Sequence, residues 1–185
     1  YRDNASSATT PSATGANAVA IGSNASAGGA NSFVVGLSAT DNSNQDAVVI
    51  GRFASASANE TVAIGEQSDA NGLRSIALGL SADANGSNSI SVGYNSQAYS
   101  QYSTAIGTDV QANSDYSTAI GYGSGGSKPA RTATGAGTMA LGGSYASGVD
   151  SFAAAIANNT SSYGAIGANS VAIGQTARSA QTNAV

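Results

Sequence analysis

Short apolar runs, each closed by a glycine, recur along almost the whole chain. The run NSVAIG at residues 169–174 is one of them, and in it large and small residues alternate before the glycine. Alternation of period two predicts a β-strand, and the glycine gives the backbone the freedom to turn a corner. From Gly22 to Gly121 the closing glycines are 14 residues apart, except for one step of 15 between Gly36 and Gly51. A fixed short period predicts one structural unit that is stacked many times.

A second alternation of small residues follows each closing glycine at three and five residues, as in Ala82 and Ala84. It predicts a second short strand. A second glycine often lies seven residues before the closing one and an asparagine follows it, as in Gly86 and Asn88, which predicts a turn. Each unit therefore reads as two strands and two turns, one coil of a narrow all-β solenoid. Ten or eleven coils stacked ~4.8 Å apart would form a rod roughly 50 Å long.

The alternation also suggests which side chains face the interior. We expect the larger residues, such as Val171 and Ile173, to fill the coil, and the small residue between them, Ala172, to face outward. Because a core this thin is marginal for an isolated chain, the small outward residues favour close approach of further copies in a symmetric homo-oligomer. The alanines that this interpretation places at the axis of a trimer are Ala20, Ala63, Ala77, Ala105, Ala119, Ala140 and Ala172.

The repeat divides the chain into a lead-in and one elongated domain. Residues 1–14 form an irregular lead-in, and residues 15–185 form the solenoid, with regular coils at 15–121. The step from Gly121 to Gly142 is 21 residues, so we expect residues 122–134 to form an outward loop. Irregular coils follow at 135–185, with further surplus residues within 156–164.

Composition excludes several classes of function. The chain has no histidine and no cysteine, and its ten acidic residues fall at different repeat positions, so neither a catalytic group nor a metal or cofactor site is predicted and we expect no enzyme. A net charge of −4 argues against nucleic acid as a partner. No apolar run is long enough to cross a bilayer, so we expect no direct contact with a membrane.

Tyrosines gather in the second half of the chain. Tyr102 and Tyr116 share one repeat position in adjacent coils and should stack ~4.8 Å apart on the outside. Such a stack is either a stabilising aromatic ladder or an exposed patch that binds a partner. The candidate ligand surface comprises Tyr94, Tyr102, Tyr116, Tyr122, Lys128 and Arg131.

The repeat resembles the YadA-like head of the trimeric autotransporter adhesins of Gram-negative bacteria. The family motif, Asn-Ser-Val-Ala-Ile-Gly, is complete at residues 169–174, near copies stand at 17–22, 31–36 and 88–93, and the resemblance covers residues 15–185. It implies a left-handed parallel β-roll, an obligate homotrimer, and adhesion to host extracellular-matrix proteins such as collagen, fibronectin or laminin. It also implies a head excised from a protein that other parts anchor in the outer membrane at the bacterial cell surface.

The resemblance leaves the ligand and its site open. Several copies replace the first asparagine of the motif, so binding could use either the repeated faces or the loops 122–134 and 156–164. A structural spacer without a receptor is the alternative to an adhesin. An ice-binding solenoid would need a flat threonine array, and only Thr104 and Thr118 recur in register.

Overall fold

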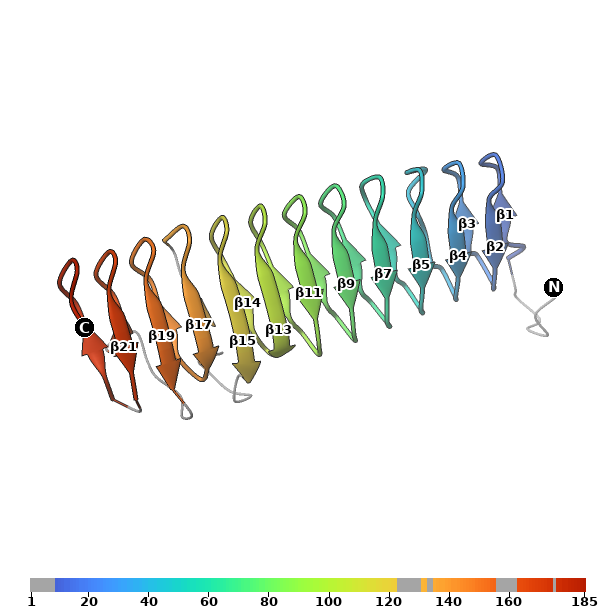
Figure 1. Cartoon of the computed structure of the whole chain (residues 1–185). Coiled ribbons are helices and arrows are strands. Elements are labelled where there is room, and N and C mark those ends of the chain that lie inside the picture. The colour runs from blue at the N-terminus through green and yellow to red at the C-terminus, as the bar shows by residue number, and fades with distance from the viewer. Residues whose placement is uncertain (1–8, 123–130, 133–134, 156–162, 175) are drawn as a thin grey trace.

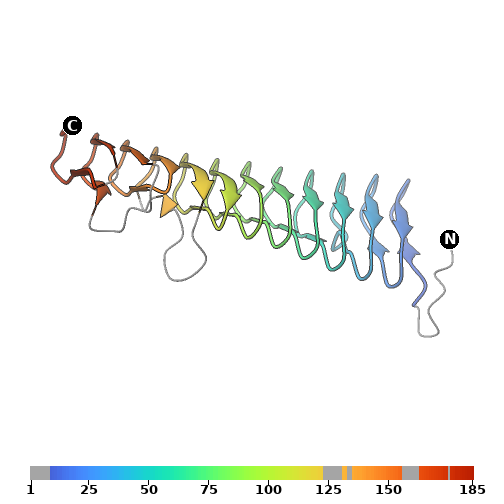
Figure 2. The same cartoon turned by 90° about the horizontal axis from the view of Figure 1, so that it is seen from below.

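The protein is a straight stack of narrow coils, with its two ends at opposite ends of the rod (Figures 1 and 2). The computed structural model describes residues 9–122, 131–132, 135–155, 163–174 and 176–185. The described residues form β-strands, turns and bends, and every strand pair among them is parallel. This part of the chain contains no helix long and apolar enough to cross a membrane.

Most coils contribute one strand to each of two long sheets. In the first sheet, every residue pairs with the residue at the same repeat position of the next coil, as Ala63 pairs with Ala77. The 14-residue period is therefore also the register of the sheet, and the predicted solenoid is confirmed. The eleven strands of this sheet are β2 (Val19–Ile21), β4 (Phe33–Val35), β5 (Val48–Ile50), β7 (Val62–Ile64), β9 (Ile76–Leu78), β11 (Ile90–Val92), β13 (Thr104–Thr108), β15 (Thr118–Tyr122), β17 (Met139–Gly142), β19 (Phe152–Ala155) and β21 (Val171–Ile173).

The predicted second strand is also present in most coils and forms the opposite sheet. Near the start of the rod, residues 12–13 and 26–27 form a separate two-stranded sheet, and Thr40 joins the two sheets only through isolated bridges. The nine strands of the opposite sheet are β6 (Ser55–Ala56), β8 (Asp69–Ala70), β10 (Asp83–Ala84), β12 (Gln97–Ala98), β14 (Gln111–Ala112), β16 (Arg131–Thr132), β18 (Tyr145–Ala146), β20 (Gly164–Ala165) and β22 (Arg178–Ser179).

Parts of two segments that we expected outside the solenoid belong to it, whereas residues 123–130 and 133–134 of the second segment lie outside the described residues. The lead-in was expected to be irregular as far as residue 14, but β1 (Ser12–Ala13) pairs with β3 (Ser26–Ala27). The loop was expected to extend over residues 122–134, but Tyr122 ends β15, and β16 pairs with both β14 and β18. In both segments, parallel pairing with the neighbouring coil satisfies backbone hydrogen bonds that a loop would leave to solvent.

The interior is filled by small side chains, and this reverses the predicted orientation of the first strand. Ala172 is buried, whereas Ile173 is 69% exposed and Val171 is partly exposed. The larger residues therefore do not fill the coil. The reason is the short distance between the two sheets: alanines of both sheets, such as Ala63 and Ala70, are fully buried and belong to one core cluster.

The assignment of alanines to a subunit axis is accordingly wrong. A side chain that is buried within one chain cannot contact another copy. Six of the seven alanines are at most 5% exposed, and the remaining one, Ala20, packs partly buried against the core. These interior alanines are Ala20, Ala63, Ala77, Ala105, Ala119, Ala140 and Ala172.

The closing glycines are required by the approach of successive coils as well as by the turn. Gly65 has a φ of 138°, and a Cβ at this position would overlap the carbonyl oxygen of Gly79 in the next coil. A side chain would therefore be strained at this φ and would also collide with backbone. Where Ala155 replaces the glycine, it still pairs with Gly142, so the register is kept.

Candidate functional site

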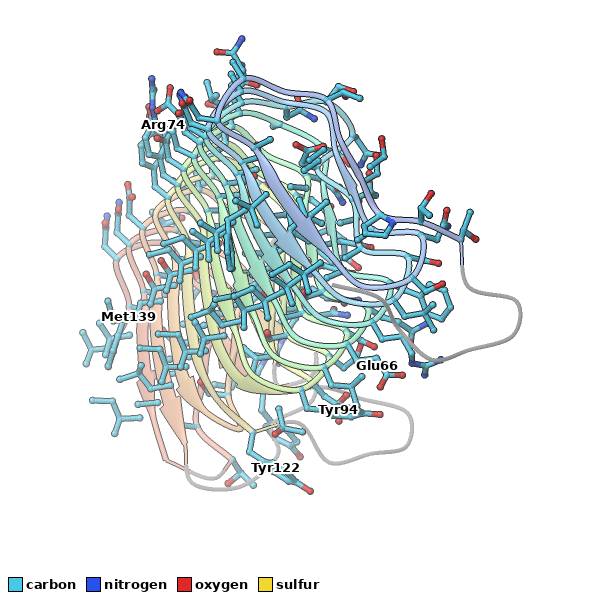
Figure 3. The ribbon with its side chains drawn as sticks, turned by 90° about the vertical axis from the view of Figure 1, so that its right-hand side faces the viewer. Glu66, Arg74, Tyr94, Tyr122 and Met139 are labelled. Atoms are coloured by element: carbon cyan, nitrogen blue, oxygen red, sulfur yellow. The ribbon has the colours of Figure 1, made fainter. Side chains whose placement is uncertain are left out.

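Viewed along the rod, each coil has two broad outer faces and two narrow edges (Figure 3). The outer side of the eleven-stranded sheet carries Met139, one edge carries Arg74, and the other edge carries Tyr94 and Tyr122. The same position in every coil faces the same way, so each face or edge is a row of equivalent residues. Function can therefore be assigned row by row.

The apolar face is the outer side of the eleven-stranded sheet, formed by the residues one and three before each closing glycine. Large apolar side chains remain partly exposed there: Phe33 is 40% exposed and Ile106 is 37% exposed. Sequence reasoning missed this face because it placed these residues inside the coil. The size alternation could have identified it, since only small residues fit between sheets this close. Its exposed members are Val19, Phe33, Ile64, Ile90, Ile106, Ile120, Met139 and Ile173.

The ridge is the edge row five residues before each closing glycine. Its residues have positive φ, from 51° to 69° in the coils described, and they form side-chain contacts from coil to coil. Asn17 donates to Asn31 at 3.2 Å, and Asn31 donates to Asp46 at 3.0 Å. The left-handed conformation suits asparagine and glycine far better than larger residues, so the bulky members are held there by the stack. The ridge consists of Asn17, Asn31, Asp46, Glu60, Arg74, Asn88, Tyr102, Tyr116, Gly137, Asp150, Asn169 and Asn183.

The predicted aromatic stack lies on this ridge and is confirmed. The rings of Tyr102 and Tyr116 have centroids 4.9 Å apart and planes 7° from parallel. Both side chains are largely exposed, at 48% and 63%. Earlier on the ridge, Arg74 forms an ion pair with Glu60 in which Nε lies 2.7 Å from Oε2.

The opposite edge, formed by the one or two residues after each closing glycine, carries the other tyrosines of the candidate surface. Tyr94 is 52% exposed and Tyr122 is 62% exposed. Arg52 lies on the same edge, with its guanidinium 5.0 Å from the centre of the Phe53 ring and paired with Glu66. The structure therefore divides the predicted ligand surface between two edges (Figure 3).

Two residues of that surface are not placed as side chains. Lys128 lies outside the described residues. Arg131 is described only through its backbone, which pairs with Gln111 and Tyr145 in the nine-stranded sheet. Of the second predicted loop, residues 156–162 lie outside the described residues, and Gly164 belongs to β20.

The polar face is the outer side of the nine-stranded sheet and carries hydrogen-bonding side chains in register. Asp69 pairs with Asp83 in adjacent strands. Further along, Gln111 donates to Gln97 at 2.7 Å. Partial burial, and then the charge of Asp83, raise the pKa of Asp69; partial burial also raises the pKa of Asp83, against the hydrogen bond from Gln97. This like-charged pair was not recognised in the sequence, although its 14-residue spacing places the two residues side by side.

In the described part of the chain, no group of three or more histidine, cysteine, aspartate or glutamate side chains could hold a metal ion. What the geometry offers instead is long rows of identical spacing, suited to repeated surface contacts.

Comparison with known families identifies the repeat. The family described as YadA head domain repeat (2 copies) matches residues 13–39, 43–68, 56–82, 84–109, 98–124 and 165–185. A comparison with curated proteins finds no matching relative. The family is adhesin-type, and neither it nor the β-solenoid fold is typical of enzymes. Because the matched ranges cover more than half of the chain and follow its stacked coils, the chain belongs to the YadA head family, a repeat of the trimeric autotransporter adhesins.

Proposed function

We propose that the chain is the head of a bacterial surface adhesin, a left-handed β-roll that assembles as a homotrimer and binds host extracellular-matrix proteins such as collagen, fibronectin or laminin. Membership of the YadA head family is the observation that carries this proposal. The family also supports a location on the cell surface, with anchorage in the outer membrane by other parts of the protein. A role in virulence would follow from adhesion to host tissue.

The apolar face is the surface that we assign to subunit contact. It runs over all eleven strands of the sheet and exposes Phe33, Ile64 and Ile106, whereas the outer side of the nine-stranded sheet carries mainly polar side chains. A continuous exposed apolar surface of this kind is typical of a protein–protein interface. Three copies placed around an axis would bury the three faces against one another in a closed assembly.

The polar face and the two edges then remain for the ligand. Their positions repeat at every coil, although the residue types vary, so a long matrix protein could make weak contacts at many coils. Three copies on one rod multiply those contacts, and linked weak contacts give high avidity without any single strong site. The rigid backbone pairing between coils keeps the rows in register.

The proposal is tested by measuring the mass in solution by light scattering and then binding to immobilised collagen, fibronectin and laminin. Ile64→Asp with Ile106→Asp should dissociate the trimer and weaken adhesion through lost valency. Asn71→Asp with Ser57→Asp on the polar face is the control for the mass measurement alone, because both residues are exposed and lie away from the apolar face. A stable trimer that binds no matrix protein would instead favour a structural spacer, and an apolar-face variant that remains trimeric would exclude this face as the interface.

A further inference from the structure

One position on the ridge has no side chain, and it lies beside the tyrosine stack. Tyr116 is followed in the next coil by Gly137, as the pairing of Thr118 with Met139 two residues later requires. Tyr102 covers one face of the Tyr116 ring at 4.9 Å, and no ridge side chain covers the other face at the next coil. This accounts for the greater exposure of Tyr116, 63% against 48% for Tyr102.

The far side of this gap is bounded by a carboxylate. Asp150 occupies the ridge in the coil after Gly137, and its Oδ1 extends into the space that a Cβ on Gly137 would take. Coils ~4.8 Å apart place Tyr116 and Asp150 about 10 Å from each other along the rod. The gap is therefore one coil wide, with an aromatic ring on one side and an acid on the other.

The gap is also negatively charged. Asp150 is exposed and has no cationic partner among the described side chains, whose ion pairs are Arg52–Glu66 and Arg74–Glu60. The described ridge from Tyr102 to Asn183 carries no positive residue. An aromatic face beside a carboxylate attracts a planar cation, because the ring and the acid act on the same positive charge.

The chain already binds a guanidinium in this manner at another place. Arg52 lies with its guanidinium 5.0 Å from the centre of the Phe53 ring and pairs with Glu66 of the next coil. The gap at Gly137 offers the same two partners, a ring and a carboxylate, but the guanidinium is not supplied by the described chain. In that example the ring and the guanidinium come from one coil and the carboxylate comes from the next, so a ring and an acid of different coils can act on one guanidinium.

We propose that the gap between Tyr116 and Asp150 binds an arginine side chain of a partner protein. The guanidinium stacks on the free face of the Tyr116 ring and donates hydrogen bonds to the Asp150 carboxylate. Oδ1 of Asp150 already reaches the level of Gly137, which has no side chain of its own to cover the ring. The proposed adhesin function is needed only to say that the arginine belongs to a matrix protein. Binding of arginine itself is measurable without adhesion.

The direct test uses the whole chain with its eight tyrosine rings labelled with carbon-13, and the probe Nα-acetyl-arginine amide. Saturable shifts of the Tyr116 resonance in the millimolar range are expected, assigned by their absence in Tyr116→Ser. Nα-acetyl-citrulline amide, which has nearly the same shape but no charge, should shift this resonance at least about tenfold more weakly. Equal shifts with citrulline, or no saturable shift with arginine in the assembled protein, would overturn the proposal.

Three variants separate this site from general attraction to an acidic protein. Gly137→Asn fills the gap with a residue type that occurs elsewhere on the ridge at positive φ, so the fold should persist while arginine binding falls at least about tenfold. Asp150→Asn should weaken binding to a similar degree. Asp46→Asn is the matched control, because it removes the same charge from the same row far from the gap, and its affinity should stay within about twofold.

A neutral sugar is the competing ligand for an exposed aromatic ring, and it is tested with methyl galactoside. If this sugar shifts Tyr116 in the parent and equally in Asp150→Asn, the gap is a sugar site and the arginine assignment is overturned. If the head binds arginine at Tyr116 but binds no matrix protein, the arginine site is supported and the proposed adhesin function is contradicted. If Gly137→Asn abolishes the arginine-induced shift of Tyr116 but leaves matrix adhesion unchanged, the matrix protein is not the partner that supplies the arginine.

Discussion

The side chain of Asp41 holds two adjacent backbone amides of the preceding coil, with Oδ2 accepting from the N–H of Gly29 at 2.9 Å. Its Oδ1 accepts from Gly28 at 2.9 Å, and also from Ser43 at 3.0 Å. Asp41 is fully buried and lies in the coil of 15 residues. One carboxylate thus supplies acceptors where the extra residue displaces the regular backbone pairing.

We expect Asp41→Ala to destabilise the rod at this coil. The change leaves the amides of Gly28 and Gly29 without their acceptor and should cost about 2–4 kcal/mol in the free energy of unfolding. Thermal or urea denaturation followed by circular dichroism measures it. Asp46→Ala is the control, because Asp46 is exposed and accepts a hydrogen bond only from the side chain of Asn31 among the contacts described. Equal losses in the two variants would contradict the role given to Asp41.

The interior alanines should tolerate no enlargement. Ala63→Leu inserts three carbon atoms between sheets whose facing residues are alanines, and overpacking of this kind costs about 1–3 kcal/mol or more. Ala16→Leu is the matched control, since Ala16 is exposed on a turn and should change stability by less than about 0.5 kcal/mol. Denaturation of both variants measures the stability of the fold, and the oligomeric mass measures assembly. Together they show whether Ala63→Leu disrupts the interior of the coil or a contact between subunits. A stable Ala63→Leu chain that only loses its assembly would place this alanine at the subunit axis after all.

How far the sequence predicts this protein differs between backbone and side chains. Period and alternation predict two strands per coil, their parallel register and the stacking of Tyr102 on Tyr116, because all of these depend on spacing alone. The direction of Ala172 and Ile173 was predicted wrongly, because alternation shows that neighbours point to opposite sides but not which side is inside. That choice depends on the distance between the two sheets, which the closing glycines and small residues together decide.

For the candidate site too, the sequence predicts the repeat position of each residue but not which side chains lie close together. Tyr94 and Tyr102 are only eight residues apart. They lie on opposite edges because β12 runs from one edge of the coil to the other between them. The gap at Gly137 lies where the sequence period is interrupted by seven extra residues. Counting back five residues from Gly142 already gives Gly137 the same repeat position as Tyr116, and the pairing of β15 with β17 confirms that the two residues lie in adjacent coils.

Acidic conditions should stabilise the paired carboxylates of the polar face. The pKa values of Asp69 and Asp83 are raised in the folded chain, so it binds more protons than the unfolded chain between the usual value of 3.8 and the raised values. Stability should therefore increase as the pH falls through the raised pKa values. Asp69→Asn should stabilise the protein at pH 7 by a few tenths of a kcal/mol and flatten this dependence.

The measurement for this pair is the melting temperature between pH 7 and pH 4 for the parent and Asp69→Asn. Asp109→Asn is the control, because Asn95, at the same position one coil earlier, donates to the carboxylate of Asp109 at 2.7 Å. It removes one negative charge without relieving a like-charged neighbour of this kind, and no stabilisation is expected. A parent whose stability falls steadily from pH 7 downward would contradict the raised pKa values.

The tyrosine stack should contribute a measurable coupling energy. Parallel rings 4.9 Å apart are worth about 0.5–1.5 kcal/mol beyond the area that they bury, so Tyr102→Ser and Tyr116→Ser should each destabilise, and the double variant should lose less than their sum. Tyr94 and Tyr122 form the matched control, because Thr108 lies between them in the same row and their coupling should be below about 0.5 kcal/mol. Denaturation of the four proteins of each cycle gives both coupling energies. If the Tyr102–Tyr116 cycle shows no coupling while adhesion is lost in both single variants, the rings bind the partner and do not stabilise the fold. If the cycle shows coupling while adhesion is unchanged, the stack is structural.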